Sequence, residues 1–148
     1  EFVKSKPLVV NGVETRWRIF GKYDLVATNE DGTLGLIDCK VSDSQRDSGQ
    51  FYSPQLEAYA LCLENPAVGR SQTVASMGLL VWKPDTAIGT SVEDYGFGVV
   101  QKYVPVERDQ ANFLTVIGEL IDVLEGELPD SGPECPTCNY LNARNALD

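Results

Sequence analysis

The feature that most constrains this fold is a short turn at residues 29–32, Asn-Glu-Asp-Gly, between two segments of β-strand character. The segments at 22–28 and 33–40 are rich in aliphatic, aromatic and β-branched residues, so together with the turn they predict an antiparallel hairpin. A three-residue loop, with Gly32 in the left-handed position of a type I turn plus bulge, fits the place of the glycine. This turn fixes which residues of the two strands lie opposite each other.

In the register that this loop sets, Asp24 lies opposite Asp38 and Lys22 lies opposite Lys40. Because side chains alternate along a strand, Asp24, Asp38 and Lys40 then point to one face of the sheet. A two-residue loop would instead pair Asp24 with Cys39 and send the two acids to opposite faces. The position of the glycine favours the first register, so we expect the acids to be neighbours.

Apart from these charges, both faces of the predicted hairpin are apolar. Val26, Leu34 and Leu36 lie on one side, and Tyr23, Leu25, Ala27 and Ile37 lie on the other. Such strands are typical of the centre of a sheet that is covered on both faces. Two neighbouring carboxylates need compensation there, and a divalent cation with Lys40 beside it would supply it. The other interpretation is an exposed strand end, where Lys40 only forms a salt bridge with one acid.

The rest of the pattern predicts a strand meander, a helix, further strands and a second helix. We expect a hairpin around Asn11-Gly12 and a helix that begins at Ser53, has Pro54 in its first position and ends before Asn65. A strand from Val74 to Trp82 should end at Pro84, and an edge strand should follow from Phe97 to Val106. A second helix should extend from about Arg108 to Glu125 and end at Gly126. The last helix carries an apolar stripe of Phe113, Leu114, Ile117, Leu120, Ile121 and Leu124. This order predicts an α/β (α+β) fold, a single domain over residues 1–128 with a central mixed β-sheet flanked by helices, followed by a cysteine-containing tail over residues 129–148.

Composition limits the chemistry that this chain can perform. Its 148 residues include no histidine, which excludes a Ser-His-Asp triad and a histidine metal site built from this chain alone. With 12 basic and 22 acidic residues the net charge is −10, which disfavours nucleic-acid binding by the isolated domain because phosphate contacts dominate that affinity. No segment has the pattern of a membrane span or a signal peptide, so we expect no membrane association and a cytoplasmic protein.

Three short motifs follow one another in the first half of the chain. They are Gly21-Lys22-Tyr23-Asp24, then Ile37-Asp38-Cys39-Lys40, then Gln55-Leu56-Glu57-Ala58-Tyr59. Their order and spacing resemble the PD-(D/E)XK nuclease superfamily, and above all its RecB-like exonuclease branch, which includes the CRISPR-associated adaptation nucleases. The resemblance covers roughly residues 12–63 and implies a restriction-endonuclease-like core.

The resemblance also implies a site. In it, the carboxylates of Asp24 and Asp38 and the backbone carbonyl of Cys39 bind the metal. Lys40 is the catalytic lysine, and Gln55 and Tyr59 are the two helix residues of the site. The implied cofactor is Mg²⁺ or Mn²⁺. Gln55 and Tyr59 are four residues apart and share one face of a helix, although an ordinary amphipathic helix has the same spacing.

The activity that the resemblance implies is metal-dependent hydrolysis of DNA phosphodiester bonds by an exonuclease of recombination, repair or phage DNA processing. The implied partners are DNA and a helicase or recombination protein. One alternative keeps the fold without the chemistry, as a catalytically inactive module for binding or scaffolding in a larger nucleic-acid-processing complex. Another is an unrelated acidic α/β domain, in which the two acids would lie apart or on different faces.

The first departure from this branch concerns a further ligand. Members usually carry an additional acid or a histidine on a helix upstream of the strands, and this chain begins too late to contain that helix. Glu1 or Glu14 could take its place, although nothing in the sequence specifically supports Glu14.

The second departure concerns the cysteines. Many relatives hold an iron–sulfur cluster on four cysteines after the nuclease core, whereas only Cys135 and Cys138 lie in the tail here. A single C-x2-C pair is weak evidence for a metal site. We therefore expect no cluster, with Cys39 and Cys62 as small core residues.

Overall fold

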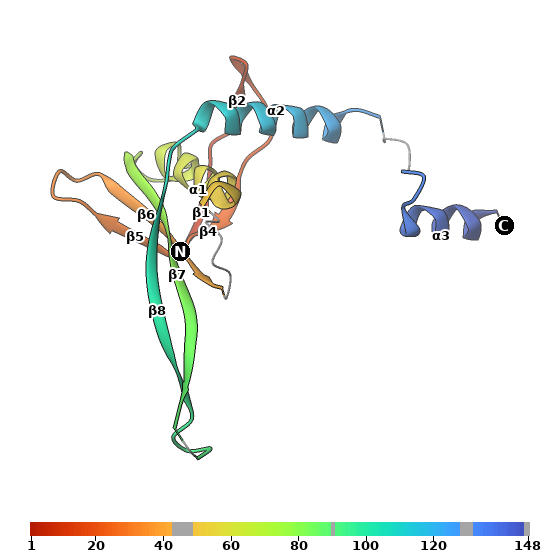
Figure 1. Cartoon of the computed structure of the whole chain (residues 1–148). Helices are drawn as coiled ribbons and strands as arrows, with labels where there is room; N and C mark the ends of the chain where they lie inside the picture. Colours follow the sequence, from red (N-terminus) through yellow and green to blue (C-terminus); the bar gives the residue numbers. More distant parts are fainter. Residues whose placement is uncertain (43–48, 90, 128–131, 147–148) are drawn as a thin grey trace.

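The computed structural model describes residues 1–42, 49–89, 91–127 and 132–146 (Figure 1). In chain order, its strands and helices are β1 (Phe2–Lys4), β2 (Val9–Val10), β3 (Val13–Glu14), β4 (Phe20–Lys22), β5 (Leu25–Thr28), β6 (Leu34–Val41), α1 (Gly49–Glu64), β7 (Val74–Ile88), β8 (Gly96–Val106), α2 (Gln110–Glu125) and α3 (Pro136–Asn145).

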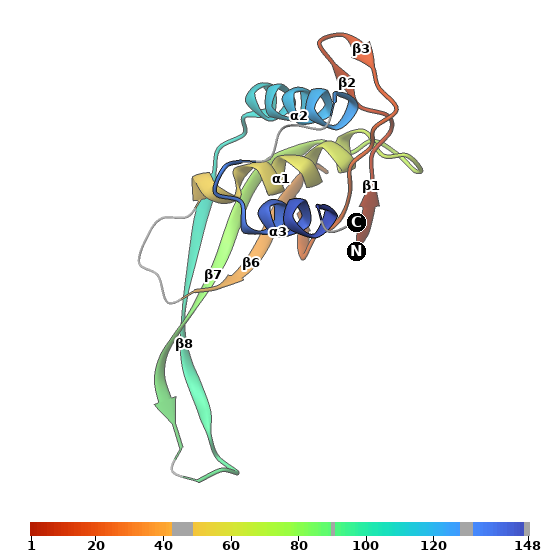
Figure 2. The ribbon, with the colours of Figure 1, turned by 90° about the vertical axis from the view of Figure 1, so that its right-hand side faces the viewer.

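A four-stranded sheet in the order β5-β6-β7-β8 forms the centre of the fold. The inner pair, β6 and β7, is parallel, and both outer pairs are antiparallel, so the sheet is mixed. α1 connects the two parallel strands and packs on one face of the sheet, and α2 packs against α1 (Figure 2). The mixed α/β domain predicted from the sequence is confirmed.

The hairpin between β5 and β6 has the predicted register. Its paired residues run from Thr28 opposite Leu34 to Leu25 opposite Ile37. Gly32 has a φ of 83°, in the left-handed region, and its N–H donates to the Asn29 carbonyl at 3.0 Å. The glycine therefore sets the register of β5 as expected, but the strand pairing ends at Leu25 and does not reach the predicted pair of Asp24 with Asp38. The Asn11-Gly12 hairpin is also confirmed, with both residues at positive φ between β2 and β3.

The single strand predicted over residues 22–28 is in fact two strands. β4 pairs with β1 in a separate two-stranded sheet, and β5 alone pairs with β6. Lys22 consequently lies opposite Phe2, and its predicted pairing with Lys40 is wrong. The cause is competition between strands for β4, because β1 pairs with β4 through backbone hydrogen bonds in place of β6.

The expectation that helices cover both faces of the hairpin is also wrong. The face towards α1 is buried, with Leu36 and Leu79 fully inaccessible. The opposite face leaves Val41 75% and Trp82 41% exposed, and among the described helices only α1 contacts the sheet. Cys39 lies on that uncovered face, so it is exposed and not the small core residue expected from the sequence. Cys62 is buried, as expected.

Two prolines lie within elements that they were expected to bound. α1 begins at Gly49 and not after Ser53, so that Pro54 lies inside the helix, where its ring is exposed. β7 continues through Pro84 as far as Ile88. The pairing of β7 with β8 shifts just after Pro84, and such irregularities accommodate a residue that has no N–H to donate. β8 is an edge strand, as predicted.

The part of the apolar face of α2 that packs into the core is shorter than the sequence suggests. α2 begins at Gln110, where the side chain of Asp109 caps it by accepting from the Asn112 N–H at 3.1 Å. The helix packs into a second core cluster, whose buried members are Leu8, Leu61, Phe113 and Ile121. Of the rest of the predicted stripe, Leu114 and Ile117 pack against this cluster, whereas Leu120 and Leu124 are about half exposed.

A buried ion-pair cluster joins α1 to the start of α2. Glu57 is fully buried, and both of its carboxylate oxygens accept from Arg108 Nε at 3.1 Å. The Asp109 backbone N–H donates to Glu57 Oε1 at 2.6 Å, and Arg108 also donates to Glu64 and to the Val74 carbonyl. Hydrogen bonds to Glu64 and Glu57 raise the pKa of Arg108 in spite of its burial. This cluster fixes the docking of α2.

The C-terminal helix α3 stands apart from these cores. Among the described elements it contacts no other helix or strand. In the ranges that the structure describes, every helix is too short or too polar to cross a lipid bilayer.

Candidate active site

The site forms where β4 and β5 separate. In the hairpin of β5 and β6, every second residue pair exchanges backbone hydrogen bonds, and Leu25 with Ile37 is the last such pair in β5. The next hydrogen-bonded pair would be Tyr23 with Cys39. Tyr23 is already engaged, since its N–H donates to the Glu1 carbonyl at 3.3 Å and its own carbonyl accepts from the Glu1 ammonium at 3.1 Å. The Cys39 N–H donates instead to Asp24 Oδ2, at 2.9 Å. A carboxylate thus replaces the missing strand carbonyl.

This replacement also affects the Cys39 carbonyl. In a strand, the N–H and C=O of one residue point to the same edge, so the Cys39 carbonyl points to the edge where Asp24 lies. The N–H that would have paired with it, that of Tyr23, donates to Glu1. The separation of the strands therefore leaves a backbone oxygen beside the Asp24 carboxylate without its strand partner.

Asp38 lies on the covered face of β6, and its side chain is 6% exposed. Its Oδ1 accepts from Gln55 Nε2 at 3.1 Å. Its Oδ2 is buried, and its partner among the described residues is the Lys40 ammonium, an ion pair at 2.7 Å. A buried carboxylate oxygen with lone pairs to spare is a natural ligand for a cation.

Gln55 connects the strand to the helix. Its Nε2 donates to Asp38 Oδ1 and lies 3.0 Å from the Tyr59 hydroxyl, while its Oε1 accepts from Lys40 Nζ at 3.3 Å. Gln55 and Tyr59 are one helical turn apart and contact each other on one face of α1, as the spacing predicts. The structure therefore brings Asp38, Lys40, Gln55 and Tyr59 into one hydrogen-bonded network.

Gly21, in the first motif, makes room for this network. A Cβ at Gly21 would lie 2.7 Å from Cε1 of Tyr59, closer than side chains approach one another. The Tyr59 ring thus packs directly on the backbone of β4. Only glycine lets the ring lie there with its hydroxyl in reach of Gln55.

We predict that Gly21→Ala lowers stability by about 1–3 kcal/mol, because the extra methyl group displaces the Tyr59 ring from a packed position. Urea denaturation measures this loss. Gly96→Ala is the matched control, since a Cβ there meets no atom within 4 Å. Equal stability of the two variants would contradict the packing argument.

The Lys40 ammonium has three neighbours besides Gln55. Burial alone would lower its pKa, but contact with Asp38 and the charges of Asp38, Tyr52 and Asp24 outweigh burial and raise it. Its Nζ lies 4.4 Å from the centre of the Tyr52 ring, a cation–π contact. Asp24 and Asp38 also both raise the pKa of the Cys39 thiol, after the larger effect of burial. The two acids therefore act on the same groups.

The donor set fits a hard divalent cation. Mg²⁺ in proteins typically takes one or two carboxylates together with waters and substrate phosphates. Here the available donors are Asp24, Asp38 and the Cys39 carbonyl. The described ranges contain no group of three or more Cys, Asp or Glu side chains placed to hold a metal ion.

The further acids proposed from the sequence lie elsewhere. Glu1 accepts from the Tyr23 hydroxyl at 3.2 Å, and Glu14 is exposed on β3, opposite Val9. Neither contacts the network around Asp38 through any hydrogen bond recorded for the described residues.

The tail cysteines are near each other but away from this network. Cys135 caps α3, and its Sγ accepts from the Cys138 N–H at 3.5 Å. Hydrogen bonds from the backbone and the side chain of Cys138 lower the pKa of Cys135.

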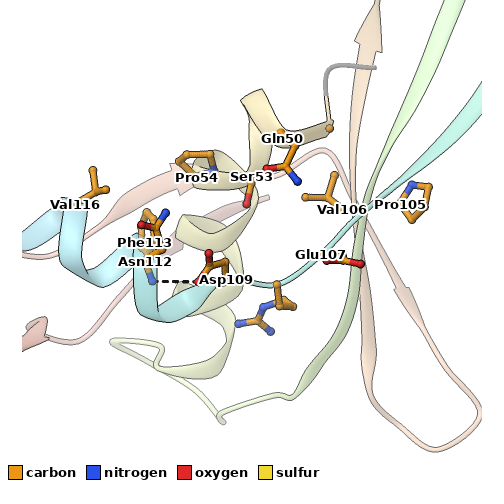
Figure 3. A pocket seen from close by; sticks show the side chains of 12 residues that line it. Gln50, Ser53, Pro54, Pro105, Val106, Glu107, Asp109, Asn112, Phe113 and Val116 are labelled. Atoms are coloured by element: carbon orange, nitrogen blue, oxygen red, sulfur yellow. Dashed lines mark hydrogen bonds between the residues drawn. The ribbon is translucent and has the colours of Figure 1, made fainter. Parts of the chain in front are cut away.

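Sequence analysis missed Tyr52 and the ion-pair cluster. Tyr52 precedes Gln55 by three residues, a spacing that places both on one helix face and could have indicated its position. A cavity of about 520 Å³ lies between the starts of α1 and α2 (Figure 3). It is lined by Ser53, Arg108 and Asp109, among others, and by none of the residues predicted for the site.

A family model described as the PD-(D/E)XK nuclease superfamily matches residues 1–143. No curated protein matches the chain. A solved structure titled "Crystal structure of SSO0001" is similar at 17% identity and a TM-score of 0.49, over 84% of this chain and 50% of that chain, so this chain spans half the length of that one.

The family match and the structure describe the same region of the molecule. The match extends over nearly the whole chain. Within it, the residues of the three motifs meet where β4 and β5 separate, beside the first half of α1. The chain therefore belongs to the PD-(D/E)XK nuclease superfamily.

Proposed function

We propose that this chain is a nuclease that hydrolyses DNA phosphodiester bonds with Mg²⁺ or Mn²⁺ held by Asp24, Asp38 and the Cys39 carbonyl. The observation that carries the proposal is the buried Asp38 carboxylate, whose Oδ2 has the Lys40 ammonium at 2.7 Å as its partner among the described residues. A carboxylate oxygen has lone pairs for a divalent cation in addition to such a partner.

The roles of the side chains follow from their contacts. A bound cation would polarise the phosphodiester and lower the pKa of a water molecule. Lys40 remains an ammonium and would stabilise the negative charge that develops on the phosphate, or orient the attacking water. Gln55 holds both Asp38 and Lys40 in place, and Tyr59 supports Gln55, so these two are positioning residues.

The finer proposal is an exonuclease of the RecB-like branch that acts in recombination, repair or phage DNA processing. The acidic chain supplies little of the positive charge that binds DNA, so a helicase or recombination protein would deliver the substrate.

Hydrolysis of linear DNA tests the proposal. We expect the chain to degrade DNA in Mn²⁺ or Mg²⁺ but not in EDTA, and Asp38→Asn to lower the rate by about two orders of magnitude or more. Asp85→Asn, an exposed acid on the distal part of β7, is the matched control and should retain the wild-type rate. The same metal-dependent rate in all three proteins would point to a contaminant and overturn the proposal.

A second candidate is a binding or scaffolding module without catalysis. The net charge of −10 favours it, because such a module need not hold DNA by itself. It predicts a folded chain that shows no hydrolysis in any divalent metal.

A further inference from the structure

Phe51 is the most exposed aromatic side chain near the candidate site. It lies on α1 one turn before Gln55 and is 79% exposed. Its ring meets that of Tyr52 edge to face, with centroids 5.2 Å apart and an interplanar angle of 88°. Since the Tyr52 ring lies against Lys40 Nζ, an unbroken series of contacts leads from Asp38 through Lys40 and Tyr52 to Phe51.

An exposed phenylalanine by itself says little, because much of any protein surface is apolar. The position of Phe51 distinguishes it from the others. Phe2 and Phe20 stack on each other, and Phe97 packs against Tyr95 near the end of the β7–β8 hairpin. Of these exposed phenylalanines, Phe51 is the one whose ring neighbour contacts the candidate catalytic lysine.

The net charge of the chain bears on how the Phe51 ring could contribute to DNA binding. A chain with a net charge of −10 gains little from the release of counterions, which dominates the affinity of most nucleic-acid-binding proteins. Stacking between a base and an aromatic ring does not require a basic surface, and it contributes about 1–3 kcal/mol per base. A base stacked on Phe51 would hold the adjoining phosphate near Lys40.

We propose that Phe51, supported by Tyr52, is a stacking platform for an unpaired base next to the phosphodiester that is cut, so that the substrate is single-stranded DNA or an unpaired end. This inference rests on the proposed nuclease function. In a duplex, the faces of each base are covered by its neighbours, and exposing one costs a few kcal/mol. The platform therefore selects strands whose bases are already free.

Fluorescence anisotropy with a labelled oligo(dT) strand tests the platform in EDTA, where hydrolysis does not occur. We expect Phe51→Ala to weaken binding by about 5- to 150-fold, and Phe51→Trp to retain it. Phe97→Ala, a similarly exposed phenylalanine away from Lys40, is the matched control and should bind as wild type does. A strand of equal length without bases, and a duplex, should both bind more weakly than the single strand.

Unchanged binding by Phe51→Ala, equal losses in Phe51→Ala and Phe97→Ala, or equal binding of the strand without bases would overturn the platform. Circular dichroism of each variant excludes loss of fold as the cause. The two proposals fail separately. Binding through Phe51 without hydrolysis in Mn²⁺ would leave the platform and remove the nuclease, while hydrolysis that does not depend on Phe51 would do the reverse.

Discussion

Lys40→Ala is expected to lower the rate of DNA hydrolysis by about two to three orders of magnitude, the usual effect of removing one group that stabilises charge in a transition state. Lys40 is suited to this role because its ammonium lies 2.7 Å from Asp38 Oδ2 and is oriented by Gln55 and Tyr52. Initial rates in Mn²⁺ measure the effect. A rate similar to that of the wild type would exclude Lys40 from the chemistry.

The same substitution should couple stability to the metal. Removing Lys40 leaves the Asp38 carboxylate buried beside no cation, which destabilises the fold. A divalent cation that binds Asp38 would then compensate, so we expect Mn²⁺ to raise the melting temperature of Lys40→Ala more than that of the wild type. Equal shifts in the two proteins would indicate that the metal does not bind next to Lys40.

Arg108→Ala is expected to lower the free energy of unfolding by about 3–5 kcal/mol, because it leaves the fully buried Glu57 without its counter-charge. The substitution also removes the hydrogen bonds from Arg108 to Glu64 and to the Val74 carbonyl. Urea denaturation measures the loss.

Arg144→Ala, an exposed arginine on α3, is the matched control and should change stability little. Replacing Glu57 with leucine and Arg108 with methionine together should recover part of the loss, since no charge then remains unpaired between them. If Arg108→Ala cost less than about 1 kcal/mol, the cluster would not be what docks α2 on α1.

Local signals in the sequence predict part of the arrangement around Asp38. The place of Gly32 in its turn determines the register of β5 and β6, and the spacing of Gln55 and Tyr59 places both on the helix face that meets Asp38. Both inferences depend only on residues close together in the chain. That is why they hold.

The separation of β4 from β5 could not be predicted in the same way. It depends on β1, which lies some twenty residues earlier and competes for the backbone groups of Tyr23. Sequence patterns along one segment do not reveal which distant strand will pair with it. The consequence is the detail that matters most, the Asp24 carboxylate on the Cys39 N–H.

Other differences have similar causes. Pro84 was expected to end β7, but the strand continues because β8 pairs with it on both sides of an irregular step. Glu57 and Arg108 are 51 residues apart, so no local pattern links them. The exposed face of the sheet depends on which helices reach it, and strand sequences that are apolar on both faces do not contain that information.

Titration of the full chain with Mn²⁺ by calorimetry tests most directly whether the separated strands form a cation site. We predict that the wild type and the control Asp85→Asn bind Mn²⁺ alike, and that Asp24→Asn and Asp38→Asn each weaken binding by about tenfold or more. Wild-type affinity in both of the latter variants, or no binding by the wild type, would contradict the account.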